Sequence, residues 1–215
     1  SREQDIRHDY YRPMALARWR AELDTSGGAP KLVSVAKRQG AQSPADQFPA
    51  RGIGLPMQGK PEGNAVQNPP YAFPFYKLEA VVPDGSVPVG FWRSVGHSHT
   101  AFFDESFVDE LASALKKDPF EFRRELLTGK PRHLKVLETA AKEAGWGQPL
   151  PAGTGRGIPL RAPVGSIVAQ VAPVVVGDGN KLQVKLVTHA IACGPGVNTP
   201  IVLLRMVRGV IYGPP

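Results

Sequence analysis

The residues best suited to hold a polar ligand lie in one short stretch, Phe91-Trp92-Arg93-Ser94-Val95-Gly96, directly before a helical pattern. An aromatic pair, one arginine and a glycine in a tight loop at a helix start can bring backbone amides close to a ligand. An isolated Arg93 would be read as a surface or salt-bridged arginine, because this side chain is seldom fully buried. The order of its neighbours favours a ligand contact instead.

Other residue types in the chain could in principle bind a metal. On a strand, a two-residue step would point the imidazoles of His97 and His99 the same way. Together with His189 and Cys193 they would make four zinc ligands on paper. No sequence signal brings the two pairs together, so no metal site is expected from these residues.

Neither acid–base nor nucleophilic chemistry has a strong candidate in this chain. Glu105 and Asp109 are four residues apart on a predicted helix, and such an acidic pair is typical of a solvated helix face. Cys193 has no positioned base in the sequence and is interpreted as a small buried hydrophobic residue. We therefore expect no catalytic residue within these 215 residues.

Three consecutive helices are predicted to position the loop. Apolar residues at steps of four predict an amphipathic helix over 100–116, with its apolar stripe in a core: Phe103, Phe107, Leu111 and Leu115. Asp118-Pro119-Phe120-Glu121 gives an N-cap, a proline at the first helical position and an acid, which predicts a second helix through Leu127. Pro131 opens a third helix, with Leu134, Leu137 and Ala141 inside, which ends at Gly145-Trp146-Gly147.

Strands are predicted on both sides of these helices. A strand over about 10–20 and the turn at 24–28 favour a hairpin with 32–37, and 76–82 alternates like a strand. Residues 39–70 have no apolar period and predict a long irregular loop, of the kind that is functional or packs on a neighbour. Further strands at 166–172 and 181–191 predict a hairpin, followed by a helix over 201–212.

The fold class expected from these elements is α+β, with mixed sheet and hairpins around a three-helix segment at about 100–145. A proline- and glycine-rich linker at 149–156 divides the chain. We expect one domain at 1–148 that carries the loop and the helices. The second, at 149–215, is expected to be a truncated β-hairpin segment.

Composition excludes several classes of protein. One cysteine rules out an internal disulfide framework or an iron–sulfur cluster held by this chain alone. The sequence contains no run of about 18 or more apolar residues, so it predicts no membrane span. The net charge of +7 is scattered and interrupted by acids, without a nucleic-acid-binding motif, so no nucleic-acid partner is expected.

The loop and the following helix, with Glu105-Ser106-Phe107-Val108-Asp109-Glu110-Leu111-Ala112, resemble the molybdenum-binding large subunit of the xanthine dehydrogenase and aldehyde oxidase family. The branch most similar contains the isoquinoline 1-oxidoreductase beta subunit and the membrane-bound aldehyde dehydrogenases. Further ordered segments resemble landmarks of that branch: Ser1 to Pro13, Gly129-Lys130-Pro131-Arg132-His133, Ala144-Gly145-Trp146-Gly147 and Gly155-Arg156-Gly157-Ile158. The resemblance therefore extends over almost the whole chain.

The resemblance implies oxidation of an aldehyde or hydroxylation of an N-heterocycle, with water as the oxygen source. It implies a molybdopterin cofactor, in its cytosine dinucleotide form, contacted by Trp92, Arg93 and Ser94, and a substrate funnel flanked by Phe91 and Val95. Iron–sulfur clusters and haem would belong to partner subunits, namely a 2Fe–2S small subunit and a cytochrome c subunit. The implied location is the bacterial periplasm or its membrane surface.

The same resemblance implies that this chain is an internal segment of a larger subunit. The family's glutamate base and its Gly-Gln-Gly segment are not found here, and Ala192-Cys193-Gly194 stands where the family has Asp-Cys-Gly. The remaining segments of the large subunit would therefore be partners of this one. The alternative is a non-catalytic, truncated or diverged domain that acts only in packing or partner binding.

Overall fold

The computed structural model describes residues 2–7, 10–47, 68–83, 86–177, 179 and 181–212. The fold is α+β, as predicted from the sequence. It divides into two compact units, one of residues 1–69 and 73–116 and one of residues 70–72 and 117–215. The domain boundary expected at 148/149 stays a prediction.

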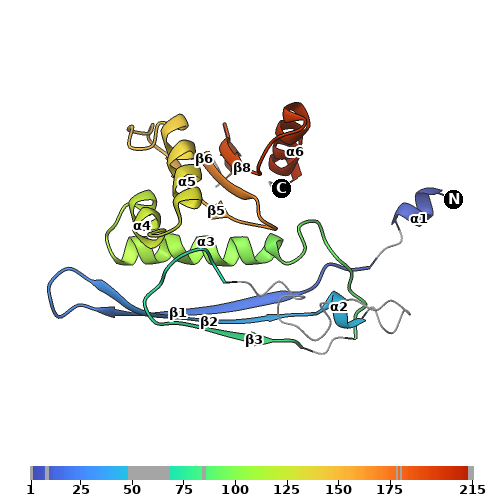
Figure 1. Cartoon of the computed structure of the whole chain (residues 1–215), viewed down its shortest axis with the longest axis horizontal. Helices are drawn as coiled ribbons and strands as arrows, with labels where there is room; N and C mark the ends of the chain where they lie inside the picture. The colour runs from blue at the N-terminus through green and yellow to red at the C-terminus, as the bar shows by residue number, and fades with distance from the viewer. Residues whose placement is uncertain are drawn as a thin grey trace. The chain divides into compact units, whose positions relative to one another are not determined.

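The first unit is built on a three-stranded sheet in the order β1-β2-β3 (Figure 1). β1 (Ala15–Asp24) and β2 (Lys31–Ala41) form the predicted antiparallel hairpin, and β3 (Tyr76–Val81) pairs with β2 in parallel. The turn begins at Asp24, whose Oδ1 accepts hydrogen bonds from the amide (2.9 Å) and hydroxyl (2.6 Å) of Ser26. These two bonds lower the pKa of the Asp24 carboxyl below its ordinary value.

Several boundaries in this unit differ from the prediction. β1 begins at Ala15 rather than Tyr10, because Tyr11 forms only an isolated bridge to Val89. β2 continues past Gln39 to Ala41, and α2 (Pro44–Gln47) follows. The first residues of the irregular loop predicted at 39–70 are therefore a strand end and a short helix. Residues 48–67 of that loop lie outside the described part. α1 (Arg2–Arg7) is a short helix near the N-terminus.

Helix α3 (His97–Ala114) lies along one face of this sheet (Figure 1). The buried residues of β2 alternate at steps of two, as Val35, Lys37 and Gln39, while Thr100, Asp104 and Val108 of α3 are buried at steps of four. A step of two residues advances a strand by about 6.6 Å, and a step of four residues advances a helix by about 6 Å. The buried residues of β2 and of α3 are therefore spaced almost equally and can contact one another in sequence. This matching spacing favours packing of α3 along β2.

The second unit begins with the other two predicted helices, α4 (Pro119–Leu126) and α5 (Pro131–Glu143). Asp118 is the predicted N-cap, because its Oδ1 accepts from the amides of Phe120 (2.9 Å) and Glu121 (3.1 Å). The indole of Trp146 also donates to this carboxylate, at 3.1 Å. Leu137 and Ala141 are buried as expected, while Leu134 is only half-buried.

Strand β6 (Ile167–Val176) organises the sheet of this unit and changes partners along its length. Its first half pairs with β5 (Leu160–Arg161) and β8 (Thr188–Ala192), and its second half pairs with β4 (Thr154–Gly157) and β7 (Leu182–Val184). The final helix, α6 (Thr199–Tyr212), covers the predicted range.

The predicted strand over 181–191 is broken into β7 and β8 at Lys185–Val187, opposite Ala172 and Pro173. Pro173 accepts from the amide of Lys185 at 3.3 Å but has no N–H to donate on the same side. The hydrogen bonding between β6 and the predicted strand is therefore interrupted opposite Pro173.

Candidate functional site

The predicted ligand-binding loop is held at its start by the segment that follows α1. Tyr11 donates its amide to Pro88 O (3.2 Å), and Gly90 donates to Tyr11 O (3.0 Å). A Cβ at Gly90 would come within 2.9 Å of the Tyr10 Cβ, so only glycine allows this approach. The contact brings Arg12 next to the loop.

The loop then makes a tight turn into α3. Val95 donates its amide to Trp92 O at 2.8 Å, and His97 donates to Ser94 O at 3.0 Å. Ser94 and Val95 both adopt left-handed backbone conformations, with φ of 67° and 52°. Such a conformation costs of order 1–3 kcal/mol per non-glycine residue and marks functional sites in many proteins. The surrounding contacts must therefore hold this turn in place.

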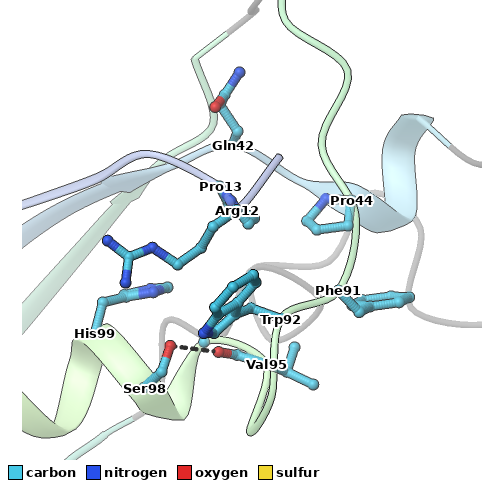
Figure 2. Close-up of a pocket in the computed structure, with 10 residues that line it drawn as sticks. Arg12, Pro13, Gln42, Pro44, Phe91, Trp92, Val95, Ser98 and His99 are labelled. Atoms are coloured by element: carbon cyan, nitrogen blue, oxygen red, sulfur yellow. Dashed lines mark hydrogen bonds between the residues drawn. The ribbon is translucent and has the colours of Figure 1, made fainter. Parts of the chain in front are cut away.

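A pocket lies between this turn and the Arg12 segment, entirely within the first unit (Figure 2). It encloses about 280 Å³ including its open mouth, and its closed part has room for about one water molecule. The residues that line it are Arg12, Pro13, Gln42, Pro44, Phe91, Trp92, Val95, Gly96, Ser98 and His99. It is thus a narrow cleft against which a larger ligand could rest.

Three of the five predicted site residues, Phe91, Trp92 and Val95, line this pocket. Arg93 and Ser94 do not; both are exposed on the turn beside it. Among the described residues, the Ser94 hydroxyl and amide make no hydrogen bond. The turn therefore presents two surfaces, a pocket wall and an exposed rim with a guanidinium and a hydroxyl.

Arg12 and His99 also line the pocket, although neither was predicted from the sequence to contact the cofactor or the substrate. Figure 2 shows the Arg12 side chain extending towards the His99 ring, with Trp92 beside them. His99 lies in the first turn of α3, next to Ser98, whose hydroxyl donates to Val95 O at 2.9 Å. The bridge between Tyr11 and Val89 and the hydrogen bonds between Met14 and Gln42 bring Arg12 here, and no local pattern encodes these contacts.

Buried polar groups fix α3 beneath the site. The Lys37 ammonium and the Asp104 carboxylate form an ion pair at 2.7 Å, with both side chains completely buried. Gln39 Nε2 donates to Thr100 Oγ1 at 3.2 Å. Trp19 stacks on Phe107 with ring centroids 4.7 Å apart, and the Lys37 ammonium lies 5.1 Å from the Trp19 ring centroid. Polar and aromatic contacts with the sheet therefore fix the first part of α3 in position.

Two side-chain interpretations are corrected by the structure, and one argument for a metal site does not apply. Glu105 is buried, at 5% exposure, rather than on a solvated helix face, because α3 packs through its charged side as well. Cys193 is exposed rather than buried. His97 and His99 lie on a helix, where a two-residue step points their side chains apart, so the strand argument for a shared metal fails.

The described residues contain no group of three or more His, Cys, Asp or Glu side chains placed to hold a metal ion. They also contain no helix long and apolar enough to cross a membrane.

Comparison with known proteins gives two relatives and no matching family model. The chain is 33% identical over 147 residues to the isoquinoline 1-oxidoreductase subunit beta of Brevundimonas diminuta, which covers 66% of this chain and 19% of that protein. It is 29% identical over 143 residues to the membrane-bound aldehyde dehydrogenase [pyrroloquinoline-quinone] of Gluconacetobacter polyoxogenes, covering 62% of this chain and 18% of that protein.

This chain spans about a fifth of the length of the curated relatives it matches. One relative is named as a subunit that acts on isoquinoline and the other as an enzyme that acts on aldehydes. The chain is therefore similar, over about two thirds of its length, to one segment of large oxidoreductases named for an N-heterocycle and for aldehydes.

Proposed function

We propose that this chain is a segment of the molybdopterin-binding subunit of an oxidoreductase, which oxidises an aldehyde or hydroxylates an N-heterocycle with water as the oxygen source. The observation that carries the proposal is the turn at Trp92–His97, the segment that resembles the cofactor loop of that family. Its strained Ser94 and Val95, its pocket wall and its exposed rim are features of a binding loop.

The residues of the turn fit the outer part of such a cofactor. The closed part of the pocket has room for about one water molecule, so a pterin would lie along the rim and not inside. Ser94 offers a hydroxyl and an amide there, Arg93 offers a cation for an oxo or phosphate group, and Trp92 offers a flat face. When bound, molybdopterin supplies a two-electron oxidation centre.

The chain's own residues then have positioning roles. Arg93 and Ser94 orient the cofactor, and Phe91 and Val95 flank the path of the substrate. The family's general base is a glutamate, but Glu105 is buried on α3 and does not line the pocket, and Asp104 is ion-paired with Lys37. We place the base in the rest of the large subunit.

The same proposal includes the cytosine dinucleotide form of the cofactor and partners that carry the electrons away. These are a 2Fe–2S small subunit and a cytochrome c subunit, in the periplasm or at its membrane surface. The name of one relative, which marks it as a beta subunit, supports a multi-subunit enzyme. The name of the other specifies pyrroloquinoline quinone, so the cofactor must be measured and not assumed.

The test is the cofactor content of the natural protein that contains this segment, purified with its partners. We expect about one molybdenum per large subunit by elemental analysis and a cytosine nucleotide released on acid hydrolysis. Arg93→Ala should lower the molybdenum content, and Arg132→Ala, an exposed arginine of α5, should leave it unchanged.

Two results would contradict the proposal. Pyrroloquinoline quinone without molybdenum would assign a different chemistry to the enzyme. A natural protein with neither group and no oxidation of aldehydes or N-heterocycles would favour the non-catalytic domain instead.

A further inference from the structure

The face of the β1-β2-β3 sheet that points away from α3 carries a regular charge pattern. The strand register aligns three rows across it: Leu16, Gly40 and Val81; then Arg18, Arg38 and Glu79; then Arg20, Ala36 and Lys77. The first row is apolar, and the next two hold four cations and one acid. No described helix of this unit covers this face (Figure 1).

The small side chain of Ala36 makes a hollow in the middle of this face. Its neighbours across the strands, Arg20 and Lys77, are long, and Arg18 and Arg38 stand in the adjacent row. The hollow holds about 260 Å³ of space for water-sized groups and is lined by Arg18, Arg20, Ala36, Lys37, Arg38, Lys77 and Glu79. It is a shallow cationic depression on an open sheet.

The charges of this face are only partly balanced within the chain. Lys77 pairs with Glu79 at 2.7 Å, and this contact lowers the pKa of the Glu79 carboxyl, with a smaller contribution from Arg38. Among the described residues, the side chains of Arg18, Arg20 and Arg38 make no hydrogen bond or ion pair. Arg18 and Arg38 are direct cross-strand partners, and like charges at such positions destabilise a sheet.

We propose that this cationic face, defined as Arg18, Arg20, Arg38 and Lys77 around Ala36, docks an acidic segment of a protein partner. Carboxylates of the partner would relieve the repulsion between Arg18 and Arg38, since arginine binds carboxylates in a bidentate manner. This surface is separate from the turn at Trp92–His97, so the inference stands apart from the proposed function.

A protein segment fits this face better than a nucleic acid does. The exposed apolar side chains of Leu16 (76%) and Val81 (40%) border the cations, and apolar contacts beside charges are typical of protein interfaces. Glu79 lies among the cations, where it would repel a continuous phosphate backbone but would leave separate carboxylates room beside each arginine.

The experiment measures binding of fluorescein-labelled hexaglutamate to the full 215-residue chain by fluorescence anisotropy, with labelled hexaglutamine as the uncharged probe. We expect saturable binding of hexaglutamate only. Arg18→Glu with Arg38→Glu should weaken it at least about tenfold, because like charges then face the probe. The matched control, Arg132→Glu with Lys135→Glu on α5, changes the net charge equally and should keep the affinity.

The milder pair Arg18→Gln with Arg38→Gln removes both charges without adding acids, and should also weaken binding while leaving the thermal unfolding temperature unchanged or raised. If the R18E/R38E pair and the α5 control lose the same affinity for hexaglutamate, the effect comes from net charge alone and the proposal is overturned. Tighter binding of a labelled DNA oligonucleotide, or competition by millimolar inorganic phosphate, would overturn the choice of a protein segment. Absence of hexaglutamate binding would overturn it as well.

Discussion

Val95 is the residue whose conformation departs furthest from its intrinsic preference in the binding loop. Its φ of 52° lies in the left-handed region, where a β-branched side chain is crowded against its own backbone. Such strain is retained where the surrounding structure imposes it. Here the amide of Val95 is bonded to Trp92 O, and its side chain lines the pocket.

Replacing Val95 by glycine should remove this strain. The relief of about 1–2 kcal/mol exceeds the extra backbone entropy of glycine in the unfolded chain, about 0.5–1 kcal/mol. We expect Val95→Gly to be as stable as the wild type or more stable by up to about 1 kcal/mol in urea unfolding. Val87→Gly, at a similarly exposed valine with ordinary φ, should lose about 1 kcal/mol. Equal losses in both variants would mean that Val95 is unstrained.

His133 gives the chain a pH-dependent contribution to stability. Burial, with the nearby charges of Lys130 and Arg132, lowers its pKa below the ordinary value. Between the folded and unfolded pKa values the unfolded chain binds more protons, so this contribution is complete above about pH 6.5 and is lost as pH falls through the folded value.

The corresponding measurement is urea unfolding at about pH 8 and about pH 5, on either side of the ordinary histidine pKa. His133→Gln should lose less stability than the wild type over this interval, because its side chain does not titrate. Lys142→Gln, on the same helix, should keep the wild-type pH dependence. A His133→Gln variant with the full wild-type loss would assign the effect to other groups.

At the scale of elements, the contact between β2 and α3 depends on the buried Lys37–Asp104 pair. Removing one partner leaves the other charge buried without this ion pair, at a cost of about 3–5 kcal/mol. We expect Lys37→Met and Asp104→Leu each to destabilise by this amount, and the double variant to cost clearly less than their sum. Additive losses in this double-mutant cycle would contradict the coupling.

The exposed Lys77–Glu79 pair is the natural comparison, because its separation is also 2.7 Å. Its side chains are 72% and 46% exposed, so solvent screens the charges. Lys77→Ala should therefore change the free energy of unfolding by less than about 1 kcal/mol. The two pairs together test whether burial, and not distance, sets the cost.

Local signals explain which elements could be predicted from the sequence. The turn at Asp24, the N-cap at Asp118 and the start of α5 at Pro131 all depend on a few adjacent residues, and all were predicted. The burial of Glu105 could not be predicted, because the same acidic pattern occurs on solvated helix faces and on buried ones. The break opposite Pro173 depends on which side of β6 the proline faces, which only the pairing decides.

The candidate site was predictable in part for the same reason. Phe91, Trp92 and Val95 lie within one short stretch of the sequence, so a motif could find the pocket wall that they form. Arg12 and Gln42 reach the pocket from other segments, through the bridge at Tyr11 and the end of β2. Their roles depend on tertiary pairing, which one sequence does not encode locally. The cofactor assignment of Trp92, Arg93 and Ser94 stays a prediction.

At the scale of the whole molecule, an apolar surface remains exposed in the second unit. Leu203 and Leu204 of α6 are 52% and 48% exposed, and Leu182 and Leu186 are 71% and 64% exposed. Exposed apolar residues gathered in patches bind hydrophobic dyes.

We therefore expect the 215-residue chain to enhance the fluorescence of anilinonaphthalene sulfonate in its folded state. Leu203→Gln with Leu204→Gln should lower this enhancement, while Leu150→Gln, at a single scattered apolar position, should not. An unchanged enhancement in the α6 variant would mean that the dye binds elsewhere.

The parallel pairing of β3 with β2 has a kinetic consequence. The antiparallel hairpin of β1 and β2 closes over a short turn, whereas β3 can add only after the whole chain between Ala41 and Tyr76 has looped back. Hairpins form in about 1–10 µs, and non-local strand pairing is slower by orders of magnitude. The hairpin should therefore nucleate the first unit, with β3 joining late along the folding pathway.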